Sequence, residues 1–307
     1  DHLFKKPEHP YLLSHSVGLQ TNEKKLVNTF FHSWETCGGN AWEDWLKIIK
    51  NFCTHIAKLL NTEDQNICPQ SNLSSALTKV IGAMEQEKLK NKTILVSEHD
   101  FPSLVHVVKI LSKRHYNIKI IPKSDPVNQI ATWEKHLDKK VAVVLITHAT
   151  SHTGQLAPIN EITKITRDKN IFSIIDVAQS IGIKKIDLKE TKADCLIGSC
   201  VKWLCGGPGA GFLWLEENKI DQLKPQDFGW FSQIDPFNYD LENFSYATDA
   251  KKFWGGTPSV LPYAIAGDAL QVLLEIGIKK IISHNEKLTN LLIEKASANK
   301  DQVINPY

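Results

Sequence analysis

Short apolar segments alternate along this chain with longer segments that carry apolar residues at helical spacing. A buried strand of a parallel sheet is apolar along its whole length, because helices cover both faces of such a sheet. Segments of this kind occur at residues 93–96, 118–121, 141–146, 171–175, 195–198 and 211–215. Most are separated from the next by a helix-compatible segment, so the alternation predicts an α/β fold with a mainly parallel sheet.

The segments with helical spacing predict helices at residues 41–60, 71–86, 104–115 and 160–169. The second of these begins with Ser71 and Asn72, polar residues that suit a helix start. A further helical stretch runs from Leu261 to about Ala298, with an interruption near Gly277.

The charge balance excludes some classes of partner. Lys and Arg total 36 against 34 Asp and Glu, which gives a formal net charge of +2 and no basic excess of the kind a nucleic-acid surface needs. Only two of the basic residues are arginines, Arg114 and Arg167. Because arginine is the side chain that binds a carboxylate through two parallel hydrogen bonds, their scarcity limits how a carboxylate substrate could be held.

No run of residues approaches the length of a membrane span. The six cysteines lack the paired spacing of zinc ligands, so we expect no metal site. They are interpreted as free thiols in a reducing compartment, and we therefore expect a cytoplasmic protein.

Two residues predict chemistry when they are taken together. Asp176 ends the apolar segment 171–175, and Lys202 follows the segment 195–198. The carboxyl ends of parallel strands are where open α/β sheets bind ligands. Alone, Asp176 is also a plausible helix cap and Lys202 an ordinary surface lysine. A lysine that forms a Schiff base, with a carboxylate for a pyridinium nitrogen, is the pair that pyridoxal phosphate chemistry requires.

The glycine-rich run at residues 206–211 invites a different interpretation, as a dinucleotide-binding turn. That fingerprint needs a third glycine and a following helix. Here Phe212 stands in place of the glycine and an apolar segment follows. A nicotinamide-dependent oxidoreductase is therefore a weak competitor.

An ordered set of motifs resembles the fold-type I pyridoxal phosphate enzymes of the class-V aminotransferase group, most closely its kynureninase-like branch. The resemblance covers nearly the whole chain and implies a three-layer α/β/α sandwich, the large domain of that fold. The matching motifs are Tyr11-Leu12-Leu13-Ser14-His15-Ser16-Val17-Gly18, Ser71-Asn72-Leu73-Ser74, Phe101-Pro102-Ser103, the loop 147–154, Asp176 with Gln179, Ser199 with Lys202, Gly229-Trp230-Phe231 and Gly255-Gly256-Thr257-Pro258.

The resemblance also implies a role for each matched residue. Lys202 would hold pyridoxal 5'-phosphate as an internal aldimine and then act as the base at the substrate Cα, leading to a quinonoid intermediate. Asp176 would pair with the ring nitrogen and Gln179 would face the phenolic oxygen, while Phe101 stacks on the ring and Thr150 lies beneath it. The residues that would hold the phosphate are Ser71, Asn72, Leu73, Ser199, Trp230 and Thr257, the last two near the interface of a homodimer.

The resemblance implies an amino-acid substrate, but the motifs leave the reaction open. Leu104, Gln179 and Val201 differ from the residues that kynureninases carry, and so does Ser232-Gln233. The motifs favour an aminotransferase and a kynureninase-like lyase equally. A cysteine desulfurase or an amino-acid epimerase fits less well. The alternative from another class is a catalytically inactive protein of this fold that serves as a structural or binding subunit.

The resemblance divides the chain into an N-terminal arm at residues 1–25, a large cofactor-binding domain at 26–265, and helices at 266–307. Those helices lead towards a C-terminal small domain, which we expect to be absent or truncated here. Family members usually bind the substrate carboxylate with an arginine of that small domain. Neither Arg114 nor Arg167 lies near a matched motif, so we expect a fragment that lacks this arginine.

Overall fold

A seven-stranded sheet forms the centre of the protein in a computed structural model, which describes residues 3–84, 92–112, 116–301 and 303. The strands lie in the order β1-β7-β6-β5-β4-β2-β3. The described strands are β1 (Ile67–Gln70), β2 (Thr93–Ser97), β3 (Asn117–Ile121), β4 (Val141–Thr147), β5 (Phe172–Asp176), β6 (Cys195–Ser199) and β7 (Gly211–Leu215).

Strands β2 to β6 are parallel to one another, as the alternation predicts. The prediction of a parallel strand at 211–215 is wrong, because β7 runs antiparallel to β6, with Ser199 opposite Gly211. A parallel crossover needs a dozen or more residues, and the glycine-rich segment 200–210 is shorter than that and turns the chain straight back. Strand β1, which was not predicted, pairs antiparallel with β7 at the edge of the sheet.

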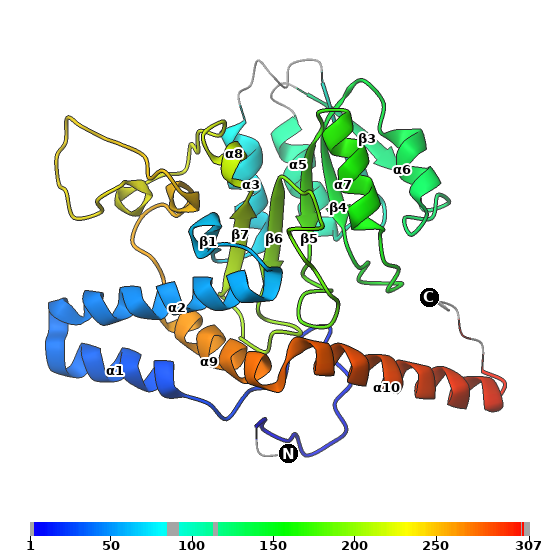
Figure 1. Cartoon of the computed structure of the whole chain (residues 1–307), viewed down its shortest axis with the longest axis horizontal. Helices are drawn as coiled ribbons and strands as arrows, with labels where there is room; N and C mark the ends of the chain where they lie inside the picture. The colour runs from blue at the N-terminus through cyan, green and yellow to red at the C-terminus, as the bar shows by residue number, and fades with distance from the viewer. Residues whose placement is uncertain (1–2, 85–91, 113–115, 302, 304–307) are drawn as a thin grey trace.

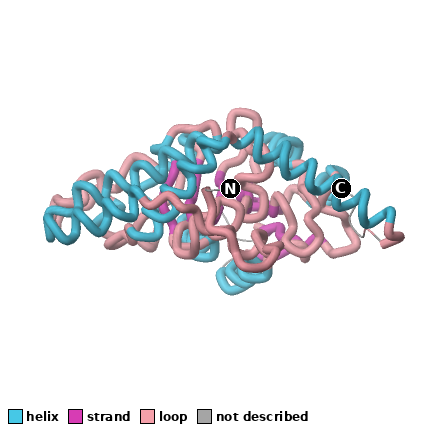
Figure 2. The backbone as a smooth tube through the Cα atoms, turned by 90° about the horizontal axis from the view of Figure 1, so that it is seen from below, coloured by secondary structure: helices cyan, strands magenta, loops and turns pink. Residues whose placement is uncertain are grey.

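Helices cover both faces of the sheet, which confirms the predicted three-layer α/β/α architecture (Figures 1 and 2). One face packs against α2, α6, α7 and α9, and the other against α3 and α5. The described helices are α1 (Lys25–Cys37), α2 (Trp42–Leu60), α3 (Leu73–Ala83), α5 (Pro102–Ser112), α6 (Ile130–His136), α7 (Ile159–Asp168), α8 (Glu217–Ile220), α9 (Leu261–Ile276) and α10 (Ile278–Ala298), with 3-10 turns η1 (Gly38–Ala41), η2 (Asp64–Asn66), η3 (Trp230–Ser232) and η4 (Ala250–Phe253).

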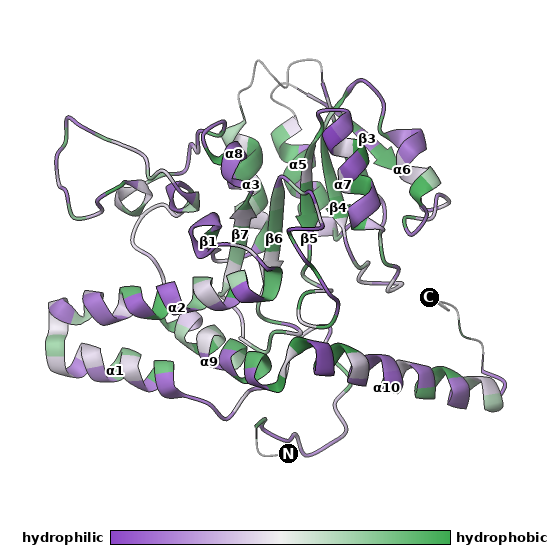
Figure 3. Cartoon of the chain, in the orientation of Figure 1, coloured by the Kyte–Doolittle hydropathy of each residue, from purple (hydrophilic) through white to green (hydrophobic). Residues whose placement is uncertain are grey.

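Side chains of consecutive strand residues alternate between the two layers of the core. In β7, Phe212 and Trp214 join the layer under α2 and α9, whereas Leu213 and Leu215 join the layer under α3. The central strands β4, β5 and β6 are accordingly apolar along most of their length, and Figure 3 draws them mostly in green. This double burial is the reason that apolar runs, rather than an alternating pattern, mark the strands in the sequence.

The predicted interruption near Gly277 is confirmed. Gly277 has φ +90°, a region that favours glycine, and α9 and α10 meet there at 79°. Helix α9 is largely buried against α2, whereas α10 has no buried residue in its described length. No single described helix is long and apolar enough to cross a membrane; α9 and α10 pass that test only as a bent pair. The proposed division at residue 265 falls within α9 and stays a prediction.

Helix α9 also fixes the start of α1. Asp268, 2% exposed, accepts hydrogen bonds from the backbone N–H groups of Leu26 at 2.8 Å and Val27 at 3.1 Å. These are first-turn amides, which have no acceptor within their own helix. We expect Asp268→Ala to lower the free energy of unfolding by about 2–3 kcal/mol, because two buried donors lose their partner. Urea unfolding measures the loss; the exposed Glu275→Ala on the same helix serves as control, and equal stability of the two variants would contradict the prediction.

Candidate functional site

Three neighbouring parallel strands end at one cavity of about 230 Å³. Thr147 ends β4, Asp176 ends β5 and Ser199 ends β6, and Thr147 lies opposite Asp176 in the sheet register. The side chains that end these strands therefore meet, as the sequence predicts for an open α/β sheet. The residues lining the cavity are Asn72, Leu73, Ser74, Phe101, Ser103, Leu104, Thr147, Ala149, Ser151, Asp176, Ala178, Gln179, Ser199, Val201 and Lys202.

Asp176 is the buried acid of this cavity, with 5% of its surface exposed. Its Oδ1 accepts a hydrogen bond from the backbone N–H of Ala178 at 2.8 Å. Burial raises the pKa of Asp176 to about 6, although the Ala178 N–H and the charge of Lys202 act in the opposite direction. Its Oδ2 receives no hydrogen bond from the described residues, so one carboxylate oxygen remains available to a ligand.

Lys202 brings an amine to the same cavity. It is half-buried, and burial lowers its pKa while Asp176 acts to raise it. Its Nζ lies 5.7 Å from the centre of the Phe101 ring, which borders the cavity from the start of α5. A lowered pKa leaves more of the amine neutral and therefore nucleophilic. The structure thus joins the two residues that the sequence singled out: Asp176 at the end of β5 and Lys202 in the segment that follows β6.

The N-terminus of α3 forms another wall. Asn72 caps the helix, accepting a hydrogen bond from the Ser75 N–H at 2.9 Å, and its amide donates to Ser71 Oγ at 3.2 Å. Ser74 and Ser103 hydroxyls lie 2.7 Å apart and join α3 to α5. First-turn amides together with the helix dipole favour an anion at this position.

The N-terminal segment lies against the Lys202 loop. Gly18 donates its N–H to the Val201 carbonyl at 2.8 Å, and a β-carbon at Gly18 would overlap the Lys202 carbonyl oxygen. Gln179 bridges the two segments: its Nε2 donates to the His15 carbonyl at 3.0 Å, and its Oε1 accepts from Trp203 Nε1 at 3.1 Å. Gln179 borders the cavity, but these contacts occupy both of its amide atoms.

Four of the predicted cofactor residues do not line the cavity. Thr150 is buried, and its Oγ1 contacts Thr153 Oγ1 at 2.6 Å and the Gln155 N–H at 3.1 Å within its own loop. Ser71 precedes the lining residues of α3. Trp230 and Thr257 lie elsewhere, where Trp230 Nε1 donates to Thr257 Oγ1 at 3.3 Å. Their roles at the cofactor remain predictions.

Sequence reasoning missed Asp100, and it interpreted His148, in the matched loop 147–154, as a loop histidine. Asp100 is buried, and its Oδ1 accepts from Thr147 Oγ1 at 2.8 Å. His148 donates its backbone N–H to the Asp176 carbonyl, its Nδ1 lies 2.9 Å from Ser180 Oγ, and burial lowers its pKa to about 4. Both residues could have been found from their place in the sequence, because Asp100 precedes Phe101 and His148 follows Thr147, and both of those residues border the cavity.

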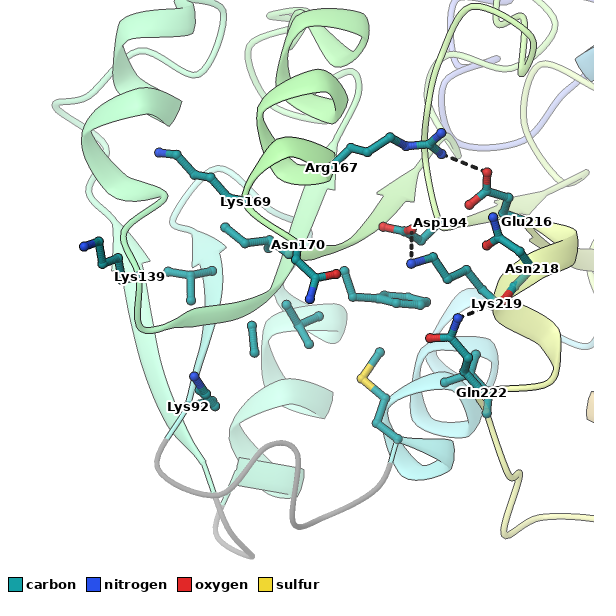
Figure 4. A pocket seen from close by; sticks show the side chains of 17 residues that line it. Lys92, Lys139, Arg167, Lys169, Asn170, Asp194, Glu216, Asn218, Lys219 and Gln222 are labelled. Carbon is teal, nitrogen blue, oxygen red and sulfur yellow. Dashed lines mark hydrogen bonds and ion pairs between the residues drawn. The ribbon is translucent and has the colours of Figure 1, made fainter.

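Arg167 does not line this cavity. Arg167 forms an ion pair with Glu216 at 2.8 Å and borders a different cavity of about 610 Å³ (Figure 4). That cavity lies at the amino ends of β4 and β5, whereas the candidate site lies at their carboxyl ends. Lys219 forms an ion pair there with Asp194 at 3.2 Å. Arg114 lies outside the described residues. Within the described chain, the cationic group that lines the candidate site is Lys202.

Two known proteins of similar sequence are an aminotransferase-like protein and a kynureninase. An "Uncharacterized aminotransferase YcbU" of Bacillus subtilis is 28% identical over 246 residues, 80% of this chain and 64% of that protein. A kynureninase of Deinococcus radiodurans is 27% identical over 263 residues, 85% of this chain and 62% of that protein. The chain therefore spans less than two thirds of the length of these relatives.

Solved structures agree in fold. A mutant of C-DES with glycine covalently linked to its pyridoxal phosphate cofactor superimposes with a TM-score of 0.81, at 20% identity over 88% of this chain and 72% of that one. The apo cysteine desulfurase of Thermococcus onnurineus NA1 also gives 0.81, at 18% identity over 95% of this chain and 74% of that one. The model of the "Aminotransferase class-V" family matches residues 36–306. The chain belongs to the class-V aminotransferase family, a family of fold-type I enzymes that depend on pyridoxal phosphate.

Proposed function

We propose that this chain binds pyridoxal 5'-phosphate at the candidate site and acts with it on an amino acid. The observation that carries this proposal is the presence of Asp176 and Lys202 at one cavity. One is a buried carboxyl with an uncommitted oxygen, and the other is an amine whose pKa burial lowers. An inactive structural subunit gains nothing from this pair, because burying charged groups is unfavourable unless they are paired and hydrogen-bonded.

The residues present fit the cofactor. Asp176 Oδ2 would accept the ring N–H, and Asn72 and Leu73 at the start of α3, together with Ser199, would hold the phosphate. Phe101 borders the cavity where a ring face would lie. When bound, pyridoxal phosphate supplies an aldehyde that combines with amines and a ring that accepts electrons.

The side chains then have separate tasks. Lys202 provides the neutral amine that holds the cofactor, and once released it can take the proton from the substrate Cα as general base. Asp176 keeps a proton at the ring nitrogen by placing a carboxylate beside it. Gln179 keeps the N-terminal segment against the Lys202 loop through its bonds to His15 and Trp203.

Two reaction types remain within the proposal, transamination and kynureninase-like cleavage. The similar proteins include one named as an aminotransferase and several named as kynureninases, which supports both. A panel of amino acids given to the full-length protein separates them, because a transaminase yields a keto acid from most accepted substrates and a lyase releases a fragment of the side chain.

We also propose a homodimer in which Trp230 and Thr257 reach the partner's cofactor. They lie away from their own chain's cavity, in a region with exposed apolar side chains that include Phe228 and Tyr239, 52% and 74% exposed. An interface between two copies would cover such side chains.

Borohydride labelling tests the proposed function directly. Full-length protein is loaded with pyridoxal phosphate, reduced and digested, and we expect mass spectrometry to find the cofactor attached to Lys202. Lys252 is the matched internal control, since burial lowers its pKa as well and its Nζ donates to the Ile220 carbonyl at 2.8 Å. Failure to bind the cofactor, or a label on Lys252 instead, would refute the proposal.

A further inference from the structure

A second buried carboxyl, Asp100, lies in the turn between β2 and α5. It is 6% exposed, and both of its oxygens accept hydrogen bonds: Oδ2 from the Ser97 N–H at 2.7 Å and Oδ1 from Thr147 Oγ1 at 2.8 Å. The carboxyl therefore ties the β2–α5 turn to the end of β4.

This position is directly behind the candidate site. Thr147 lines the cavity and lies opposite Asp176 in the sheet register, and Phe101, the residue after Asp100, lines another wall. Asp100 itself does not border the cavity. It can therefore influence a ligand only from behind Thr147 and not by contact.

The two hydrogen bonds do not by themselves explain an acid here. An asparagine could accept from the Ser97 N–H and donate to the Thr147 hydroxyl, which can reverse its role. It would avoid the cost of burying a charge next to Asp176. Burial and the neighbouring Asp176 charge raise the pKa of Asp100 to about 7, although its hydrogen bonds act in the opposite direction.

The ionised form of Asp100 needs a positive charge nearby. His148, at the end of β4, is neutral at physiological pH because burial lowers its pKa to about 4. Lys202 is the cation near Asp176, and the proposed function occupies its amine in holding the cofactor. Other titratable groups of this turn are Glu98, whose Oε2 accepts a hydrogen bond from the Lys123 N–H at 2.8 Å, and His99. The His99 ring nitrogen lies 3.3 Å from that of His152, whose pKa is lowered by burial. Among the described residues that line the cavity, the cationic side chain is Lys202, so a cationic ligand would supply the balancing charge.

We propose that Asp100 is a positioning residue that acts from behind Thr147 to strengthen the negative field at Asp176, and thereby selects a ligand with a protonated ring nitrogen over an uncharged ligand of the same shape. The inference rests on the proposed function, because it assigns the ring nitrogen to Asp176.

Two ligands separate charge selection from a purely structural role. Dissociation constants of the full-length protein are measured at pH 8 for pyridoxal phosphate and for its 1-deaza analogue, in which a C–H group replaces the ring nitrogen. We expect Asp100→Asn to weaken pyridoxal phosphate about tenfold, the size of a single charge–charge interaction across a partly shielded site, and to leave the analogue unchanged. The difference in pyridoxal phosphate affinity between the wild type and Asp100→Asn should disappear as the pH falls towards 5.5, because Asp100 is then protonated and uncharged like the asparagine.

Ser103→Ala is the matched control. It removes the hydrogen bond between α5 and α3 at the wall that carries Phe101, so it should weaken both ligands equally. Thr147→Val is the second variant, should Asp100→Asn fold poorly. It removes one hydrogen-bond donor from the Asp100 carboxylate, and this raises the pKa of Asp100. The preference for pyridoxal phosphate over the 1-deaza analogue should then appear only at higher pH than in the wild type.

Equal effects of Asp100→Asn on the two ligands, including no effect on either, would overturn the inference and leave the proposed function standing. A wild-type protein that binds neither ligand would refute the proposed function and this inference with it.

Discussion

Replacing Lys202 by alanine is expected to lower turnover of an amino-acid substrate by about a thousandfold or more, since positioned general bases alone contribute roughly two to four powers of ten. The same amine has two tasks in the proposed mechanism, holding the cofactor and removing the Cα proton. Its lowered pKa suits both, because each needs a neutral amine. Steady-state kinetics on the full-length protein, with accepted substrates from the panel, measure the loss.

Lys252→Met provides the matched comparison for this prediction. Lys252 is 5% exposed, and its pKa is lowered by burial, but it lies against Ile220 and the Tyr246 ring, away from the cavity. We expect that variant to lose stability and to keep its turnover. An added small amine should restore part of the Lys202→Ala activity, because the vacated space lets it act as the base. Unchanged turnover in Lys202→Ala would remove Lys202 from the mechanism.

The sequence predicted the parallel strands because double burial makes each of them a continuous apolar run. It failed at β1, whose residues include Pro69 and Gln70. An edge strand pairs on one side only and can accept a proline, so its sequence carries little of the apolar signal. It also failed on the direction of β7, since the direction depends on the length of the turn and not on the strand residues.

The candidate site was predictable where a residue ends a strand. Asp176 and Lys202 follow strands whose positions the apolar runs give, and parallel strands bring their ends together. Thr150 illustrates the limit: its neighbours Ala149 and Ser151 line the cavity, whereas its own hydroxyl turns into the loop. Asp100 was missed because the role proposed for it depends on a hydrogen bond with Thr147, forty-seven residues away in the sequence.

The paired carboxyls predict an unusual dependence of stability on pH. Burial raises the pKa of Asp176 to about 6 and that of Asp100 to about 7, from 3.8 for an unperturbed aspartate. The folded protein therefore binds these protons more tightly than the unfolded chain. The stabilisation is fully present below pH 3.8 and is lost as the pH rises through 6 and 7. For the cofactor-free protein, the pair should lower the free energy of unfolding by on the order of 4 kcal/mol between pH 5 and pH 8.

Urea unfolding of the wild type and of the double variant Asp100→Asn/Asp176→Asn isolates this contribution, because all other titrating groups are common to both proteins and cancel in the difference. The double variant should be more stable than the wild type at pH 8, and the difference should shrink by about 4 kcal/mol as the pH falls to 5 and vanish only below pH 3.8. Bound pyridoxal phosphate should reduce the pH dependence of the wild type, since a protonated ring nitrogen beside Asp176 offsets the charge that makes ionisation costly. If the free energy of unfolding varied with pH in the same way for both proteins, burial would not make ionisation of either carboxyl unfavourable. The electrostatic basis assigned here to the cofactor site would then be wrong.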